Sequence, residues 1–130
     1  MITLDASVVI AHLQPRDAHH EAATNYLREH ADQPLLIHSL NLAEVLIGAV
    51  KAGRGKELLD DSHGIGLRVA LQSDGEPLRI AALSVETGLK LPDCCALDTV
   101  LASKSTLAPF DERLAAAAHA RHVKVGPASA

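Results

Sequence analysis

The stretch LLIHSLNLAEVLIGAVKAG (residues 35–53) shows the clearest change of element type in the chain. Its start, directly after a proline, is rich in Leu and Ile and predicts a strand over 35–38. From about residue 40 to 52, apolar side chains recur at the i, i+3, i+4, i+7, i+8 spacing of an amphipathic helix, at Leu42, Val45, Leu46, Ala49 and Val50. A glycine at 53 then stands where glycine commonly follows the end of a helix. The stretch therefore predicts a strand followed directly by a helix.

Short apolar runs alternate with helical patterns on both sides of this unit. Further strands are predicted at 1–4, 77–79, 106–110 and 123–125, and further helices at 18–30, from 54 to about 61, up to about 87, from 92 to about 102, and at 112–121. The β-branched residues 8–10 leave open whether the first strand continues through them. No repeat or linker divides the chain, so we expect one domain over residues 1–130. The alternation predicts an α/β fold around a mainly parallel sheet.

Composition and charge narrow the classes of function. With 130 residues and 48% apolar residues, the chain is long and apolar enough to bury a core without disulfides. The net charge of −4 argues against holding nucleic acid through a global positive field. Aromatic residues make up only 2% of the chain, which counts against binding bases on exposed aromatic rings.

The cysteines and the N-terminal segment indicate a compartment. Cys94 and Cys95 are adjacent and cannot supply a disulfide framework, so we expect a reducing environment. The first residues lack a basic leader, and Asp5 interrupts the apolar run that a signal peptide needs. No stretch approaches the roughly 18 apolar residues of a membrane span. We therefore expect a soluble cytoplasmic protein without membrane contact.

Four acidic residues occupy comparable places in the predicted fold. Asp5 and Asp111 follow strands, whereas Asp93 stands before a helix and Glu44 lies in the first turn of another. Because open parallel sheets bind ligands beyond the carboxyl ends of their strands, Asp5 and Asp111 should converge there. Glu44 is two residues from Leu42, about 200° round the helix, so it points away from the apolar stripe. The four carboxylates are thus candidates for a single site.

Each acid also has a purely structural alternative. Asp5, Asp93 and Asp111 would serve as ordinary N-caps, and Glu44 would close a capping box with Asn41. As a group, however, carboxylates about 4 Å apart repel by ~4 kcal/mol per pair at an effective dielectric of ~20. Such a cluster protonates in part unless a cation lies within it. Hard oxygen ligands favour Mg²⁺ or Mn²⁺, and the reaction then predicted is phosphodiester hydrolysis by metal-activated water.

Four segments resemble the acidic motifs of PIN-domain ribonucleases. MITLDASVVIAHL, with Asp5 ending a strand and Ser7 two residues on, is similar to the opening of that family. NLAEVLIGA around Glu44, LPDCCALDTVLA around Asp93 and PFDERLAAAA around Asp111 resemble its second, third and fourth motifs. The segments occur in the family's order over nearly the whole chain. The branch that they most resemble is the VapC-like toxins of toxin–antitoxin pairs.

The resemblance implies a fold, a cofactor and partners. The fold is a three-layer α/β/α sandwich with a central, mainly parallel sheet, and Mg²⁺ or Mn²⁺ binds at Asp5, Glu44, Asp93 and Asp111. The activity that the resemblance implies is that of an endoribonuclease acting on structured RNA such as tRNA or rRNA. The resemblance also implies a homodimer whose site is covered by the C-terminal tail of a cognate VapB-like antitoxin. Ser7 supports Asp5.

The fourth motif departs from the family pattern. The family often has Ser or Thr two residues before the fourth acid, where this chain has Pro109. This leaves open whether Asp111 or Asp98 completes the site, although Asp98 lies five residues after Asp93 and about 140° round a helix from it. Arg113, close to the fourth acid, is the candidate for contacting a phosphate.

Three other functions are compatible with the same residues. A PIN-type nuclease for RNA maturation would use the same acids without a toxin role. A receiver-like Mg²⁺-binding phospho-switch also carries acids at strand ends, but it needs an acidic pair in the first loop, where this chain has Asp5 alone. A non-catalytic interaction module would use the acids only as caps.

His19 and His20 are expected at the exposed start of a helix, with no chemical role.

Overall fold

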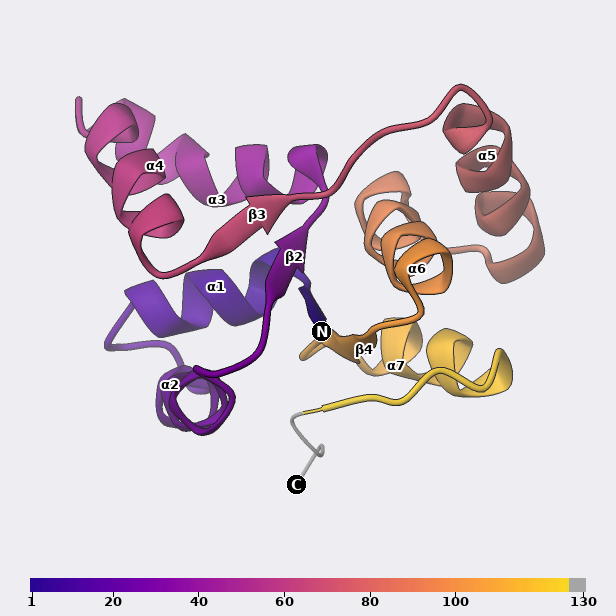
Figure 1. Ribbon diagram of the computed structural model, residues 1–130, viewed down its shortest axis with the longest axis horizontal. Coiled ribbons are helices and arrows are strands. Elements are labelled where there is room, and N and C mark those ends of the chain that lie inside the picture. Colours follow the sequence, from indigo (N-terminus) through magenta and orange to yellow (C-terminus); the bar gives the residue numbers. More distant parts are fainter. Residues whose placement is uncertain (127–130) are drawn as a thin grey trace.

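A parallel sheet forms the central layer of the computed structural model, which describes residues 1–126 (Figure 1). Within these residues the strands are β1 (Ile2–Leu4), β2 (Leu35–Ile37), β3 (Leu67–Val69) and β4 (Thr106–Ala108). Their order is β3-β2-β1-β4, and every neighbouring pair is parallel. The central strand β1 is buried throughout, as expected for a parallel sheet covered on both faces.

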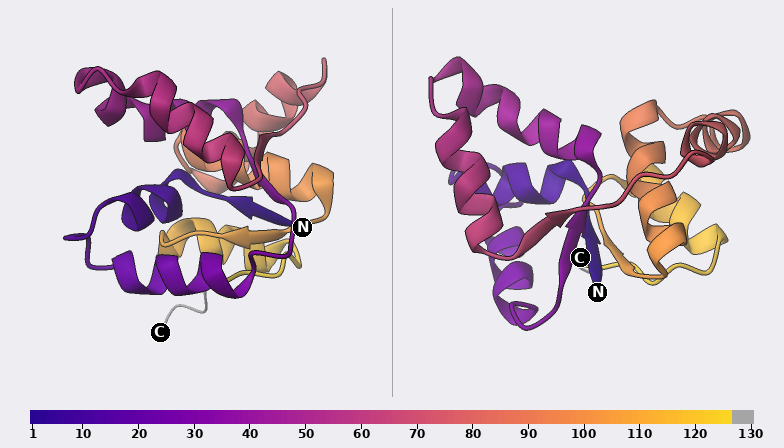
Figure 2. Two further views of the ribbon diagram at one scale, coloured as in Figure 1. Left: turned by 60° about the vertical axis from the view of Figure 1, so that its left-hand side comes forward. Right: turned by 45° about the horizontal axis from the view of Figure 1, so that its top comes forward.

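Helices cover the sheet as two separate groups. On the left of Figure 1 lie α1 (Ala6–Leu13), α2 (His20–Glu29), α3 (Ser39–Lys51) and α4 (Gly55–Gly64). On the right lie α5 (Glu76–Thr87), α6 (Leu91–Ser103) and α7 (Glu112–Ala120). The right-hand view of Figure 2 shows the same separation from another side. The structure is thus the three-layer α/β/α sandwich that the resemblance implied.

Each helical group packs its own apolar core against the sheet. One core joins α1 and α2 to Ile2 and Leu4 of β1, and the other joins α5, α6 and α7 to Leu107 of β4. The β-branched residues 8–10 belong to helix α1 and do not extend the first strand. Val8 and Val9 are buried there, so tertiary packing outweighs their preference for strands.

Two of the predicted strands are wrong, and one strand was not predicted. Residues 77–79 lie in the first turn of α5, where the fixed φ of Pro77 suits a helix start. The segment 123–125 contributes only an isolated bridge between Val125 and Leu107. The unpredicted strand is β3, whose three residues include a single buried side chain, Leu67, so it carries no readable alternation.

The predicted helices agree closely with the structure. The helix predicted over 40–52 is α3, and Gly88 ends α5 in the left-handed conformation (φ 72°) that glycine adopts readily. No helix within residues 1–126 combines the length and the apolar character needed to cross a membrane.

Candidate active site at the carboxyl end of the sheet

Asp5 and Asp111 cap helices and at the same time face the end of the sheet. Asp5 follows β1, is 5% exposed, and accepts hydrogen bonds from the backbone N–H (3.3 Å) and hydroxyl (2.6 Å) of Ser7. Asp111, beyond the end of β4, is exposed and accepts from the backbone N–H of Leu114 at 3.0 Å. Capping therefore accounts structurally for these two acids.

Glu44 and Asp93 are not caps. Helix α3 begins at Ser39 and is capped by His38, so Glu44 lies beyond the first turn in which it was expected. Asp93 lies inside the first turn of α6, whose N-cap is Lys90, and does not precede the helix as predicted. Both carboxylates are half-buried. The structural alternative therefore fails for two of the four acids.

Asn41 joins the elements that carry these two acids. Its side chain is fully buried, and its amide Nδ2 donates to Glu44 Oε1 (3.2 Å) and to the carbonyl of Pro92 (3.0 Å), the residue before Asp93. The sequence indicated Asn41 only as a capping-box partner, which is incorrect because His38 caps the helix. Within residues 1–126, the other amide atom, Oδ1, is buried without a hydrogen-bond partner. Asn41 thus positions Glu44 against the start of α6 and leaves one oxygen uncommitted.

The acids influence each other's ionisation. Burial, followed by the charges of Asp5, Asp111 and Glu44, raises the pKa of Asp93 to about 6, although the nearby Arg113 opposes the rise. Burial also raises the pKa of Asp5, against the hydrogen bonds from Ser7, and the charge of Asp111 adds to the rise. Asp93 therefore lies near enough to experience the charge of each of the other three acids, and Asp5 also experiences the charge of Asp111, as in a cluster of negative charges.

Ser7 connects the first acid to the loop that carries the fourth. Its hydroxyl donates to Asp5 and accepts a hydrogen bond from the backbone N–H of Phe110 at 3.2 Å. Phe110 directly precedes Asp111. The loop after β4 is therefore held at the site even though Pro109 replaces the hydroxyl residue of the related motif.

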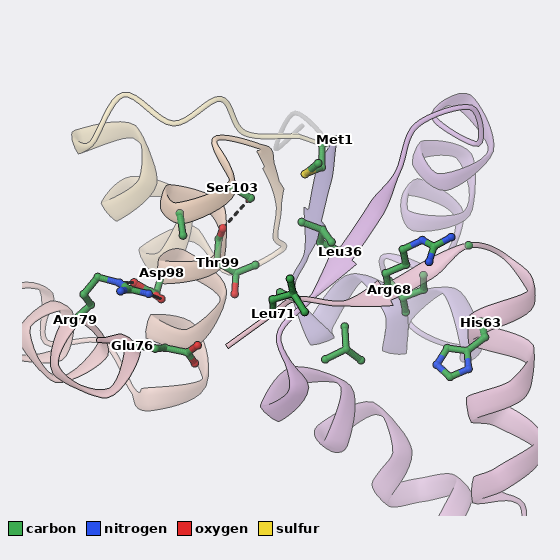
Figure 3. Close-up of a pocket in the computed structure, with 15 residues that line it drawn as sticks. Met1, Leu36, His63, Arg68, Leu71, Glu76, Arg79, Asp98, Thr99 and Ser103 are labelled. Carbon is green, nitrogen blue, oxygen red and sulfur yellow. Dashed lines mark hydrogen bonds and ion pairs between the residues drawn. The ribbon is translucent and has the colours of Figure 1, made fainter. Parts of the chain in front are cut away.

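Asp98 lies in a different environment. It is 4% exposed and accepts hydrogen bonds from Arg79 Nε (2.9 Å) and Nη2 (3.2 Å). Figure 3 shows this pair at the edge of a cavity of about 840 Å³ that β3 also lines, and Asp98 is not among the groups that perturb Asp93. The geometry thus places Asp111, not Asp98, with the other three acids.

The donor set suits a hard divalent cation. Within residues 1–126, no three Asp, Glu, His or Cys side chains converge closely enough to hold an ion by themselves. Mg²⁺, however, usually keeps several waters and takes only one or two carboxylates from a protein. Mutually repelling carboxylates and the unpaired oxygen of Asn41 supply ligands of the kind that Mg²⁺ or Mn²⁺ prefers.

Fold and site together define a class of protein, in which a parallel α/β/α sandwich carries an acidic cluster at the carboxyl end of its sheet. Residues 2–120 match the family model of the PIN domain, so the chain belongs to the PIN-domain family. PIN domains are generally nucleases. This assignment leaves no support for the receiver-like alternative. Comparison with curated proteins gives no match.

Solved structures with the same fold come from several bacteria. A toxin–antitoxin complex from Klebsiella pneumoniae has a TM-score of 0.69 at 22% identity, over 85% of this chain and 87% of that chain. VapBC2 from Rickettsia felis, bound to a DNA fragment from its promoter, has a TM-score of 0.74 at 17% identity, over 97% and 98%. FitAcB from Neisseria gonorrhoeae has a TM-score of 0.69 at 17% identity, over 96% of each chain. At these identities the likeness extends to the fold alone.

Proposed function

We propose that this chain is a Mg²⁺- or Mn²⁺-dependent endoribonuclease and the toxin of a toxin–antitoxin pair. The observation that carries the proposal is the position of Glu44 and Asp93, which cap no helix, together with the effect of the charges of Glu44, Asp5 and Asp111, which all raise the pKa of Asp93. Neither a fold nor a helix end requires such an arrangement. A divalent cation offsets its cost and is used in hydrolysing phosphodiesters.

The chain's own residues bind and orient. In this proposal Asp5, Glu44, Asp93 and Asp111 provide the oxygen ligands, and the buried Ser7–Asp5 hydrogen bond fixes the orientation of the first. Bound Mg²⁺ or Mn²⁺ supplies an acidified water as nucleophile and offsets the charge that builds on the phosphate. Arg113 is exposed and close enough to Asp93 to lower its pKa, which suits contact with an RNA phosphate beside the acids.

Two measurements test the nuclease and its metal. Mn²⁺ should raise the melting temperature of the wild-type chain, and the same ion should be required for cleavage of structured RNA such as tRNA or rRNA. Catalysis that persists in EDTA, or a melt unchanged by Mn²⁺ and Mg²⁺, would contradict the proposal. An interaction module that uses its acids only as caps would show neither response.

A groove beside Glu44 supports a polypeptide partner. It measures about 440 Å³, lies between α1 and α3–α4, and is lined by Ile10, Leu13, Val45 and Leu58 as well as Glu44. Ile10 and Leu13 remain 37% and 39% exposed. We assign this groove to the C-terminal tail of a VapB-like antitoxin, whose apolar side chains would bury it and whose basic side chains would neutralise the acids. The Klebsiella and Rickettsia structures are themselves toxin–antitoxin complexes.

Expression distinguishes the toxin from an RNA-maturation enzyme of the same family. Production of the chain without its partner should stop the growth of the cells that produce it. We place the protein in the cytoplasm, where the free thiols of Cys94 and Cys95 stay reduced. Co-production of the antitoxin should restore growth. A chain that cleaves RNA in vitro and leaves growth unaffected would belong to RNA maturation.

Self-association completes the proposal. Met1, Val69 and Leu71 are 50%, 41% and 99% exposed, and all three line the 840 Å³ cavity. Figure 3 shows Met1 and Leu71 among the lining side chains. Apolar side chains left exposed around one cavity indicate an interaction surface, and we assign it to a second copy of the chain. Light scattering should give a dimer for the wild type and a monomer for Leu71→Asp. A wild-type monomer would contradict this part alone.

A further inference from the structure

His19 and Phe110 form a stacked pair of rings beside the acidic site. Their ring centroids are 4.4 Å apart and their planes differ by 13°. Phe110 is half-buried and packs against the core beneath α1 and α2, whereas His19 is exposed at the start of α2. One face of the imidazole therefore lies on Phe110, and its exposed surface comes from the opposite face and the edge. The imidazole of His19 is thus a flat, exposed ring that Phe110 supports on one side.

Three links hold this pair at the site. Phe110 directly precedes Asp111, and consecutive Cα atoms lie about 3.8 Å apart. The backbone N–H of Phe110 donates to Ser7 Oγ, which in turn donates to Asp5. On the other ring, the backbone N–H of His19 donates to Asp17 Oδ1 at 2.8 Å and fixes the start of α2. The stack is thus part of the same loop as the fourth acid and is linked to the first acid through the hydrogen bonds of Ser7.

The connection from α1 to α2 is also held in place. His20 Nδ1 lies 2.9 Å from the carbonyl of Ala11, and His12 Nδ1 lies 2.9 Å from Thr24 Oγ1. Both neighbouring imidazoles therefore already have a hydrogen-bond partner within the protein. Within residues 1–126, in contrast, neither ring nitrogen of His19 forms a hydrogen bond. Its ring is oriented by stacking alone and is free to accept a further ring.

We propose that the open face of His19, supported by Phe110, stacks an unpaired nucleobase of the RNA next to the phosphate held at the acids. Imidazole rings serve as stacking surfaces for bases in RNA-binding proteins. Stacking does not distinguish strongly among bases but requires one that is unpaired. The substrate is therefore a loop, bulge or single-stranded region of an RNA. The inference rests on the proposed nuclease function and adds the form of its substrate.

This assignment changes what the low aromatic content means. Counting only Phe, Tyr and Trp argued against base stacking, because the chain has one Phe, one Tyr and no Trp. The structure places an imidazole on the single Phe instead. A histidine supplies the π face, and the phenylalanine supplies the rigid support.

The test separates a stacking ring from a side chain that merely covers Phe110. His19→Leu covers Phe110 with apolar surface but has no π face, whereas His19→Tyr keeps a flat ring. Both are made in an Asp93→Asn background, so that nothing is cleaved whether or not the wild type is a nuclease. Binding to a short single-stranded RNA, and to an abasic ribose-phosphate chain of equal length, is measured by fluorescence anisotropy, with a thermal melt of each variant.

His19→Leu should weaken binding to the RNA about 10-fold and leave binding to the abasic chain unchanged, and His19→Tyr should match the parent. Equal binding by His19→Leu and the parent would overturn the proposal. So would an equal loss on both chains, or a loss seen only with a polypeptide antitoxin. In the cleaving protein, the same change should raise KM about 10-fold with little change in kcat. Absence of wild-type cleavage would count against the nuclease, and the binding comparison would still decide the role of His19.

Discussion

Two sets of acidic side chains in this molecule differ in how their charge is balanced. The paired acids are Asp98, which accepts two hydrogen bonds from Arg79, and Glu76, which bonds to His38. The clustered acids are those assigned to the active site, namely Asp5, Glu44, Asp93 and Asp111. Within residues 1–126, no clustered acid forms an ion pair. The charge of the paired acids is thus balanced by neighbouring side chains, whereas the clustered acids have no such partner within these residues.

The pair between His38 and Glu76 shows how complete the compensation is in the first set. His38 Nδ1 accepts a hydrogen bond from the backbone N–H of Leu40 at 3.0 Å, so this nitrogen carries no proton. The proton of the neutral ring must then lie on Nε2, which donates to Glu76. One buried side chain thus caps α3 and binds the start of α5. The carboxylates of this set are therefore engaged by neighbouring side chains and serve the fold.

The largest expected effect is on catalysis, and it should divide the two sets. Asp93→Asn should lower kcat/KM for RNA about 1,000-fold, because it removes a proposed metal ligand with little change in the shape of the side chain. Asp98→Asn is the matched control, since it makes the same chemical change in the paired set. It should change kcat/KM of the folded protein by no more than about 3-fold. Initial rates at saturating Mn²⁺ measure both.

The reverse result would break the comparison. If Asp98→Asn abolished cleavage and Asp93→Asn retained it, Asp98 would complete the site in place of one of the assigned acids. Circular dichroism of both variants ensures that an unfolded protein is not mistaken for an inactive one.

The next effect is on stability and belongs to the paired acids. Glu76→Ala should lower the free energy of unfolding by about 2 kcal/mol, because it leaves the buried Nε2–H of His38 without an acceptor. Urea denaturation measures the change, and Glu57→Ala, in an exposed pair with Arg54, is the control that should cost less than about 0.5 kcal/mol. Equal losses in the two variants would show that burial does not distinguish the pairs.

Much of this division was predictable from sequence, since strand ends and helix starts are readable features. Asp5 and Asp111 follow apolar runs, and the parallel sheet that places them together follows from the alternation of elements. The periodicity around Glu44 located α3 closely. These predictions succeeded because each depends on local spacing and on one general property of parallel sheets.

Other features depend on contacts between distant segments and could not be read in this way. Asn41 contacts Pro92, which lies 51 positions further along the chain, and His19 stacks on Phe110, which lies 91 positions further along. The pairing of Asp98 with Arg79 requires α5 to pack on α6, which no local pattern specifies. The helix start at Ser39 was missed because a histidine cap is uncommon beside Ser, Thr, Asp and Asn.

A smaller catalytic effect is expected at the residue that joins two clustered acids. Asn41→Ala should lower kcat about 10-fold and raise the Mn²⁺ concentration needed for half-maximal activity, because Glu44 loses its hydrogen bond to a fixed amide. Rates measured across a Mn²⁺ titration show both changes. Asn25→Ala, an exposed change on α2, is the control and should alter neither. A loss of stability with unchanged metal dependence would make Asn41 a packing residue only.

The smallest effect concerns the stability of the metal-free protein and has the opposite sign to the catalytic one. Burial and the neighbouring carboxylates raise the pKa of Asp93 from about 4 to about 6. Between these values the folded state binds more protons than the unfolded state, so the free energy of unfolding of the wild type falls as the pH rises through this window. Asparagine does not titrate and avoids the loss.

Metal-free Asp93→Asn should therefore match the wild type near pH 4 and exceed it at pH 8. The full pKa change would correspond to about 3 kcal/mol, and solvent screening at this half-exposed position reduces the expected gain to about 1 kcal/mol. Urea unfolding in EDTA at the two pH values measures it. Added Mn²⁺ should reverse the order at pH 8, because only the wild type keeps the full ligand set. A variant that is less stable than the wild type at pH 8 in EDTA would mean that the charge of Asp93 is balanced within the protein, and the distinction between paired and clustered acids would then be lost.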